Sequence, residues 1–290
     1  MLYIIMTMIL LLGWYIITVK QYEQTSYYNV TKNSYLSMRL DAGRDGEYLT
    51  YKYLRSYEKK GARFLFNCYL PRDKDMTTEI DVLMIYKSGL YVFESKNYSG
   101  WIFGSEKGRT WTQTLPNGKT SHKEHFLNPI MQNNLHIKWL REAVGGERIP
   151  MHSVIVFSER CTLKKVEVSS QDIKVIKRDR IVTTVAQIDK EYKVILSEEQ
   201  ISEIYDKLYG YTQVSQADKE KHVQNIQMNN LQDIQEHSVK EDAGKELICP
   251  KCGFALVLRT AKRGDNAGRK FYGCSTYPKC RYMKQLEENL

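Results

Sequence analysis

Two apolar segments joined by a short polar turn constrain the fold of this chain more than any other feature. Residues 77–86 read TTEIDVLMIY and residues 89–97 read GLYVFESKN, with a Ser-Gly turn at their junction. Apolar runs of this length on either side of a turn signal predict a β-hairpin. Because strand side chains alternate between faces, Glu94 and Lys96 share one face. The hairpin then brings that face beside Asp81.

These three charged side chains match the needs of a divalent metal site. Carboxylate oxygens are preferred ligands of Mg²⁺, and a neighbouring ammonium group can orient water or stabilise charge on a phosphate. Asp81, Glu94 and Lys96 are therefore candidates for a hydrolytic site that uses Mg²⁺ or Mn²⁺. The competing interpretation is that they are solvated charges at strand ends, which are common on protein surfaces.

The stretch from residue 43 to about residue 156 resembles the nuclease-related domain, a branch of the restriction-endonuclease-like fold. Four pieces occur in the order and spacing of that family. They are GRDGEYLTYKYL (43–54), TTEIDVLMIY (77–86), GLYVFESKNYSGWIFG (89–104) and NPIMQNNLHIKWL (128–140). The resemblance implies an α/β fold, with a mixed sheet flanked by helices, and a phosphodiester-cleaving activity.

The resemblance also implies roles for individual residues. Asp81 and Glu94 would hold the metal with help from the Ser95 carbonyl, and Lys96 would position the attacking water. Glu47 would be an additional acidic ligand, although an acidic residue near a helix start can simply favour the positive end of the helix dipole. Gln132 would face the same cleft, or would only form a structural hydrogen bond.

A pair of histidines in the same region does not favour a second metal site. His122 and His125 form an H-x-x-H pair, but they follow an Asn-Gly turn in a polar stretch. We expect no metal ion there.

The N-terminal run is apolar enough to cross a membrane. Residues 1–19 contain no charged side chain, and Lys20 closes the run. At about 1.5 Å per residue a helix of this length spans a bilayer core of about 30 Å. A cleaved signal peptide is the alternative, but no basic residue precedes the run and no small-residue cleavage site follows it. We predict a single-pass anchor at 1–20 and a spacer at 21–42.

The flank after this run predicts the orientation. It carries four basic residues, Lys20, Lys32, Arg39 and Arg44, against Glu23 and Asp41. Basic residues favour the cytoplasmic side, so the C-terminal bulk is expected in the cytoplasm, at the cell membrane.

The cysteines indicate a metal site and not a disulfide framework. Four of the six form a C-x2-C knuckle and a C-x5-C knuckle in the last 42 residues, at Cys249, Cys252, Cys274 and Cys280. Four thiolates at such spacing can bind a tetrahedral Zn²⁺, and a module of about 40 residues needs that metal for stability. With no open coordination position, the zinc is expected to be structural.

The segment 249–282 resembles the small zinc ribbons at the C-termini of type IA DNA topoisomerases, which implies binding to single-stranded DNA. Residues 249–290 carry nine Lys and Arg against three Asp and Glu, in a chain of net charge +9. Basic residues can contact phosphates and aromatic rings can stack on bases. The candidates are Arg259, Lys262, Arg263, Arg269, Lys270, Phe271, Tyr272 and Arg281. The alternative is a solvated basic surface with aromatic rings packed around zinc.

The remaining segments complete the predicted organisation. The nuclease-related domain is expected over 43–210, with its best-matched part at 43–156, and the zinc ribbon over 247–290. Short strands are expected near 173–176 and 181–185. Residues 211–246 are rich in Gln, Asn, Lys and Glu and poor in large apolar residues, which predicts a linker.

Three functions are compatible with this sequence. The leading hypothesis is a membrane-anchored, metal-dependent nuclease acting on DNA, with the ribbon as a nucleic-acid-binding arm. The second is a non-catalytic tether that holds nucleic acid at the membrane. The third is a scaffold whose ribbon binds another protein. Cleavage separates the first from the others, and salt-sensitive DNA binding separates the second from the third.

Overall fold

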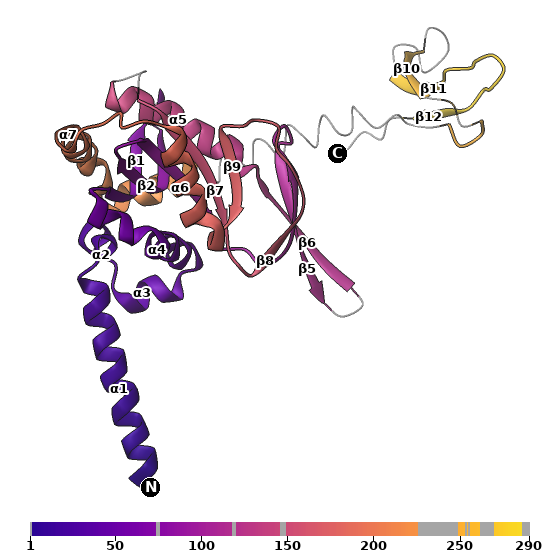
Figure 1. Ribbon diagram of the computed structural model, residues 1–290. Coiled ribbons are helices and arrows are strands. Elements are labelled where there is room, and N and C mark those ends of the chain that lie inside the picture. The colour runs from indigo at the N-terminus through magenta and orange to yellow at the C-terminus, as the bar shows by residue number, and fades with distance from the viewer. Residues whose placement is uncertain are drawn as a thin grey trace. The chain divides into compact units, whose positions relative to one another are not determined.

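The computed structural model describes residues 2–73, 76–117, 120–145, 149–225, 249–252, 254, 256–261 and 270–285 (Figure 1). The chain divides into two compact units, Met1–His222 and Val223–Leu290. The predicted ribbon residues Lys262, Arg263 and Arg269, and the linker residues 226–246, lie outside the described residues.

A five-stranded mixed sheet forms the centre of the first unit. Its strand order is β1 (Arg63–Pro71), β2 (Thr77–Tyr86), β3 (Gly89–Lys96), β7 (Met151–Phe157) and β9 (Ile173–Lys177). The first three strands are antiparallel neighbours, whereas β7 and β9 run parallel to β3. The β2–β3 hairpin has the predicted turn, since Tyr86 pairs with Gly89.

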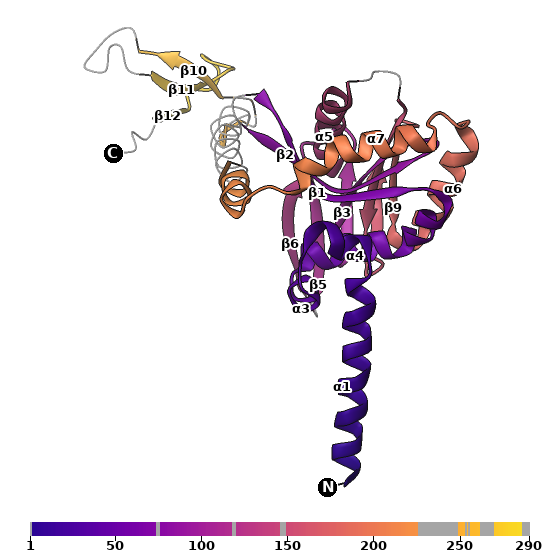
Figure 2. The ribbon, with the colours of Figure 1, turned by 90° about the vertical axis from the view of Figure 1, so that its left-hand side faces the viewer.

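Helices cover both faces of this sheet (Figure 2). On one face, α4 (Ala42–Leu54) and α6 (Ile181–Glu191) bury Leu54 and Val185 against the sheet. On the other face, α5 (Pro129–Val144) and α7 (Glu198–Tyr209) bury Leu140 and Ile201. The sheet is therefore apolar on both sides, and the protein has the mixed α/β architecture that its sequence predicts.

Among the described residues, 3₁₀ helices connect several of these elements. They are η1 (Arg55–Lys60) after α4, η3 (Arg178–Arg180) before α6 and η4 (Gly210–Thr212) after α7. Ser197 begins α7 with a capping box, because its hydroxyl accepts from Gln200 N while Gln200 Oε1 accepts from Ser197 N.

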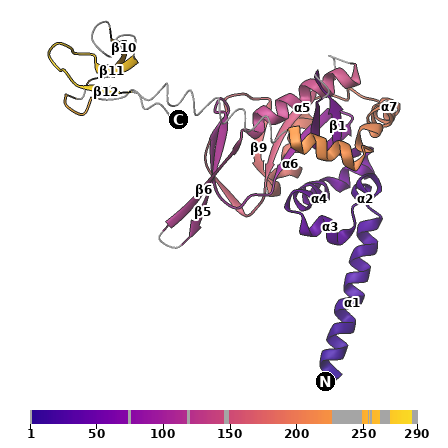
Figure 3. The ribbon, with the colours of Figure 1, turned by 180° about the vertical axis from the view of Figure 1, so that it is seen from behind.

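A second, four-stranded sheet follows the hairpin directly. Its strand order is β6 (Thr120–Leu127), β5 (Thr110–Asn117), β4 (Gly100–Ser105) and β8 (Cys161–Glu167). Its inner face buries Ile102 and Trp111 in a cluster with Phe157 of the first sheet. Figure 3 shows the β5–β6 ribbon extending beyond the other strands.

The N-terminal segments pack onto the α4 side of the first sheet. Helix α1 (Leu2–Glu23) is long and apolar enough to cross a bilayer by length and composition. The predicted spacer folds into α2 (Ser26–Thr31) and α3 (Tyr35–Leu40), and Tyr22, Tyr27 and Met38 are buried in the core. Tyrosine hydroxyls make the segment appear polar in sequence, but the rings can still pack and the hydroxyls find partners.

One predicted strand is wrong. Residues 181–185 open α6, in which Ile181, Val185 and Ile188 are buried along one helical face. Their spacing of four and three residues satisfies a helix, and burial of that face prevails over the strand preference of β-branched residues.

The second unit contains a small antiparallel sheet. Strands β10 (Leu256–Thr260) and β12 (Met283–Gln285) flank β11 (Lys270–Cys274). Its buried cluster comprises Leu256 and three of the cysteines, Cys249, Cys274 and Cys280.

Candidate active site and metal centre

The β2–β3 hairpin brings Asp81, Glu94 and Lys96 together. The β2–β3 pairing ends at Val82 with Phe93, and Asp81 and Glu94 are the next residues of the two strands. The backbone N–H of Ser95 donates a hydrogen bond of 2.8 Å to Asp81 Oδ2, and Lys96 Nζ lies 2.7 Å from Glu94 Oε1. The structure therefore places the three charged residues in the arrangement that the sequence predicts.

Glu94 is an ionised carboxylate in a buried position. It is 3% exposed, and its second oxygen, Oε2, lies 3.0 Å from His136 Nε2. Burial opposes ionisation, but Lys96 and His136 together lower the pKa of Glu94 to about 2. Burial also disfavours the charged form of Lys96, whereas Glu94 and Asp81 hold its pKa above the usual value. The pair is ionised at neutral pH.

The other carboxylates of the site resist ionisation. Burial, followed by the charges of Glu94 and Glu47, raises the pKa of Asp81 well above its usual value. Burial and then Glu79 raise the pKa of Glu47 to about 7. Glu79, two residues before Asp81 on the same face of β2, also has a raised pKa, first because of burial. Four carboxylates thus share a site in which Lys96 forms the closest ion pair.

Glu47 is fixed by two hydrogen bonds from outside its own helix. Asn67 Nδ2 donates to Glu47 Oε2 at 2.9 Å, and Tyr27 Oη donates to the same oxygen at 3.2 Å. Asn67 lies between Phe66 and Cys68, which pair with Val82 and Ile80, and it has a φ of 49°, in the left-handed region. Such backbone strain in a non-glycine residue is concentrated at functional sites.

Helix α4 approaches β3 closely enough to hold Glu47 there. A Cβ atom at Gly46 would lie 3.0 Å from Asn97 Cβ and 3.2 Å from Ser95 Oγ, so these neighbouring side chains would have to shift by a few tenths of an ångström to admit a larger residue. Thr50 Oγ1 lies 3.2 Å from Ser95 Oγ, one helical turn further on. Ser95 points away from the carboxylate face, as the strand alternation predicts.

Helix α5 supplies Gln132 and a histidine that sequence reasoning missed. His136 links Glu94 to Thr78, whose Oγ1 lies 2.6 Å from His136 Nδ1. Gln132 is one turn earlier on the same face of the helix, and its buried Oε1 has no hydrogen-bond partner. The signal was available in the sequence, because Gln132 and His136 are four residues apart in a predicted helix.

These residues fit a divalent cation. An excess of carboxylates with raised pKa values would be relieved by a positive ion, and the unpartnered Gln132 oxygen is a potential ligand. Asp81, Glu47 and Gln132 have oxygens to offer, whereas both oxygens of Glu94 already have partners. Among the described residues, only the four cysteines form a group of three or more potential ligands within 4.8 Å of one another.

Part of the predicted linker contacts the same region. Residues 216–225 are helical, and His222 is buried. His222 Nδ1 lies 2.8 Å from Thr77 Oγ1, and its Nε2 lies 3.7 Å from Glu79 Oε2. Sequence reasoning missed this contact because the segment as a whole has a polar composition.

His122 and His125 do not form a metal pair. Both lie on β6, and residues three apart on a strand point to opposite faces. His122 Nε2 contacts Glu124 at 3.1 Å, whereas His125 Nδ1 contacts Thr112 at 3.1 Å. That no metal ion binds there remains a prediction.

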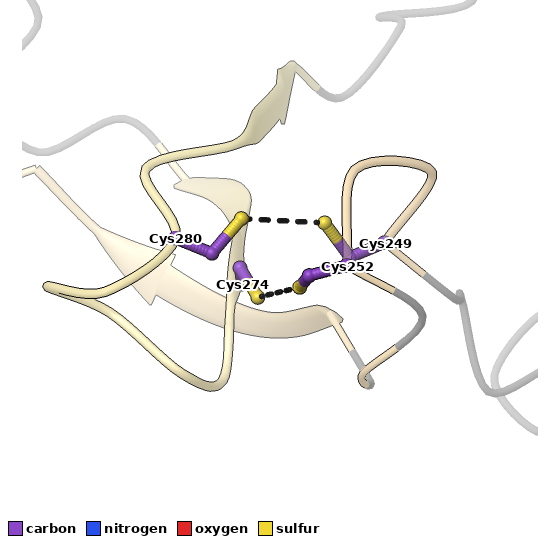
Figure 4. A group of neighbouring side chains, drawn as sticks. All are labelled: Cys249, Cys252, Cys274 and Cys280. Carbon is purple, nitrogen blue, oxygen red and sulfur yellow. Dashed lines mark hydrogen bonds between the residues drawn. The ribbon is translucent and has the colours of Figure 1, made fainter.

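The four ribbon cysteines point toward one another (Figure 4). The Sγ atoms of Cys249 and Cys280 are 3.7 Å apart, those of Cys252 and Cys274 are 3.3 Å apart, and all four thiols are free. A tetrahedral zinc with Zn–S bonds of about 2.3 Å separates its sulfurs by about 3.8 Å. The cluster is a structural zinc site, with every position taken by sulfur.

The ribbon residues that were predicted to bind nucleic acid, and that the structure describes, differ in how accessible their side chains are. Lys270 and Arg281 are exposed. Arg259 donates to the Cys274 carbonyl at 3.3 Å and lies over the Tyr277 ring, so it has a structural role. Phe271 is half-buried, and Tyr272 packs against the cysteine cluster. Tyr277, which is 59% exposed, is a more accessible aromatic ring than either.

Comparisons with known proteins match two segments of the chain. Residues 42–158 match the nuclease-related domain, and residues 246–289 match the topoisomerase DNA-binding C4 zinc finger. An uncharacterized protein of Bacillus anthracis is 33% identical over 184 residues, which cover 62% of this chain and 82% of that protein. The chain belongs to the nuclease-related domain family.

The ribbon has relatives of its own. DNA topoisomerase 1 of Mycoplasma genitalium is 51% identical over 43 residues, which cover 14% of this chain and 6% of that protein. DNA topoisomerase 1 of Methanocaldococcus jannaschii is 40% identical over 55 residues, which cover 19% of this chain and 6% of that protein. The shared part is thus a small fraction of either topoisomerase. No solved structure matches the chain.

Proposed function

We propose that this protein is a membrane-anchored, metal-dependent nuclease that hydrolyses phosphodiester bonds of DNA. The observation that carries the proposal is the convergence of Asp81, Glu94 and Lys96 at the end of the β2–β3 hairpin, with Ser95 N bonded to Asp81. Its membership of the nuclease-related domain family supports the same reaction class.

Each residue has a chemical role in this proposal. Asp81 and Glu94 would hold Mg²⁺ or Mn²⁺ together with the Ser95 carbonyl, and Glu47 and Gln132 would face the same ion. When bound, the metal would supply Lewis-acid stabilisation of the phosphate and a more acidic water. Lys96, which stays protonated because Glu94 and Asp81 raise its pKa, orients the attacking water and stabilises charge on the scissile phosphate.

The ribbon is the nucleic-acid-binding arm in this proposal. Its match to a DNA-binding zinc finger favours DNA as the substrate. Exposed Lys270 and Arg281 can contact phosphates, and Tyr277 can stack on a base.

Helix α1 is the membrane anchor in this proposal. Apolar side chains are exposed along its length, and such a surface is unfavourable in water. The basic residues that follow it favour a cytoplasmic location for the catalytic unit.

The test is cleavage of supercoiled plasmid and single-stranded DNA by the full chain in nanodiscs, with Mg²⁺ or Mn²⁺. Lys96→Ala is expected to lower the cleavage rate by about 10²–10³-fold. Lys52→Ala on α4 is the control, because it removes the same charge from an exposed position outside the site. Equal cleavage by Lys96→Ala and wild type would refute this active site.

One observation favours a second function, a non-catalytic nucleic-acid tether. Both oxygens of Glu94 are already engaged, by Lys96 and His136, so the site is partly neutralised without a metal. Salt-dependent DNA binding with no cleavage in either metal would establish this function instead. Salt-resistant binding of a protein partner, with no DNA affinity, would indicate a scaffold.

A further inference from the structure

The second sheet has one buried face and one open face. On the inner face, Trp111 is fully buried and Ile102 packs beside it. The neighbouring positions belong to the outer face, because side chains alternate along a strand. Paired residues lie on the same face, so Trp101 is in one row with Thr114 and Thr162, and Lys123 extends that row on β6. Thr114 is covered within this row, at 5% exposure, whereas Thr162 and Lys123 are exposed.

Trp101 is unusual because a large ring lies open on this outer face. It is 40% exposed, and Lys164 Nζ lies 5.5 Å from the centre of its ring. The register of β4 with β8 shifts between Ile102, which pairs with Leu163, and Phe103, which pairs with Lys165. Lys164 is the extra residue at this bulge, and it lies beside the Trp101 ring. An exposed indole can stack on a planar ring, and the cation beside it can attract a negatively charged group attached to that ring.

The outer face also has a basic character. Lys123 and Lys164 are exposed there, and His125 occupies the adjacent row, across from Thr112. Lys165 is in the same row as Phe103, but Glu167 lies 3.4 Å from it and offsets its charge. The surface combines ring stacking with phosphate-binding cations, which is the chemistry that recognises an unpaired nucleic-acid strand.

This face is close to the candidate active site along the chain. Trp101 is five residues after Lys96, and an extended chain covers at most about 3.6 Å per residue, so their Cα atoms are within about 18 Å. The distance between Trp101 and Lys96 is therefore no more than a few nucleotides can span.

We propose that the outer face of the β6–β5–β4–β8 sheet binds an unpaired nucleic-acid strand, with one base stacked on Trp101 and its phosphates beside Lys164 and Lys123. The proposal rests on the proposed function only for the identity of the ligand. It assigns a second nucleic-acid-binding surface, on the nuclease-related unit itself, in addition to the zinc ribbon.

The test is the affinity of the full chain in nanodiscs for a fluorescent single-stranded oligonucleotide, measured by anisotropy without added Mg²⁺. Trp101→Ala is expected to weaken binding by about 5–100-fold, because base–aromatic stacking contributes about 1–3 kcal/mol. Trp101→Phe is expected to retain most of the affinity. Tyr53→Ala is the matched control, since Tyr53 is also 40% exposed but lies on α4. Lys164→Ala is expected to reduce the slope of log affinity against log salt by about 0.7.

Photo-cross-linking separates this surface from the ribbon. An oligonucleotide carrying 4-thiothymidine is expected to cross-link to the peptide that contains Trp101, and to lose that product in Trp101→Ala. Cross-links confined to the ribbon, or unchanged affinity in Trp101→Ala, would overturn the proposal. Equal weakening for a blunt duplex would also overturn it, because paired bases cannot stack on the ring. A chain that binds through Trp101 but cuts no DNA would refute the nuclease function and leave this surface established.

Discussion

The unit that ends at His222 buries clusters of large apolar side chains on both faces of its central sheet, whereas the buried cluster of the ribbon is built from three cysteines and Leu256. The first unit can therefore hold Glu94 and Lys96 in a defined place without a metal. The ribbon has too little apolar surface to do so, and its geometry depends on zinc. Zinc has a structural role in the ribbon, whereas the divalent cation proposed for the first unit has a catalytic one.

Removal of a zinc ligand should produce the largest difference between the units. Cys274→Ser is expected to unfold the ribbon, because zinc binding to such modules contributes on the order of 10 kcal/mol. The first unit should keep its melting temperature. Zinc content by mass spectrometry and limited proteolysis would measure both effects. A ribbon that stays protease-resistant without zinc would break the comparison.

Truncation of a core side chain should destabilise the first unit and leave the ribbon unaffected. Leu83 is fully buried on the α5 side of the sheet, and Leu83→Ala is expected to destabilise the first unit by about 2–5 kcal/mol. Zinc content should not change. Differential scanning calorimetry would measure the shift, with Leu36→Ala as a control at an exposed leucine. Equal shifts for both variants would contradict the assignment of Leu83 to the core.

The raised pKa of Glu47 predicts a pH-dependent stability in the metal-free protein. Glu47 has a pKa of about 7 in the folded chain and a lower one when unfolded, so the folded state binds more protons between these values. Stability is therefore lost as pH rises through that interval. Glu47→Gln is expected to be more stable than wild type at pH 8, by on the order of 1–3 kcal/mol, and similar at pH 4.

Thermal unfolding at the two pH values, with and without Mg²⁺, would test the Glu47 prediction. Mg²⁺ should stabilise the wild type at pH 8 more than it stabilises Glu47→Gln. A variant that is equally stabilised or destabilised at both pH values would show that Glu47 does not titrate as expected.

The smallest expected effect concerns the contact between the N-terminal segment and the site. Tyr27→Phe removes the hydrogen bond to Glu47, which should cost about 0.5–1.5 kcal/mol and weaken Mn²⁺ binding several-fold. Tyr22→Phe is the matched control, because Tyr22 is in the same cluster but donates to the Asn33 carbonyl. Electron paramagnetic resonance of free Mn²⁺ would measure binding without any cleavage assay. Equal Mn²⁺ affinity in the two variants would exclude a positioning role for Tyr27.

Local features of the sequence were sufficient to predict the structural features that involve residues close together in the chain. The hairpin register follows from the turn before Gly89, and the cysteine cluster follows from knuckle spacing. Contacts between distant segments were not predictable in this way. His136 to Glu94 and His222 to Thr77 join residues 42 and 145 positions apart. The strand expected at 181–185 failed because burial of Ile181 and Val185 depends on where the sheet lies, which no local pattern specifies.

The junction between α1 and the first unit has a mechanical consequence. Tyr22 belongs to α1, yet its ring is buried among Tyr27, Tyr35 and Tyr48 at the base of the domain. If α1 spans a bilayer, the first unit cannot rotate freely with respect to the membrane, because Tyr22 fixes the helix to it. The site at Asp81, Glu94 and Lys96 would then keep a fixed height and orientation above the lipid surface. A nucleic-acid ligand would have to reach that height, and the protein would search for it by lateral diffusion in the plane of the membrane.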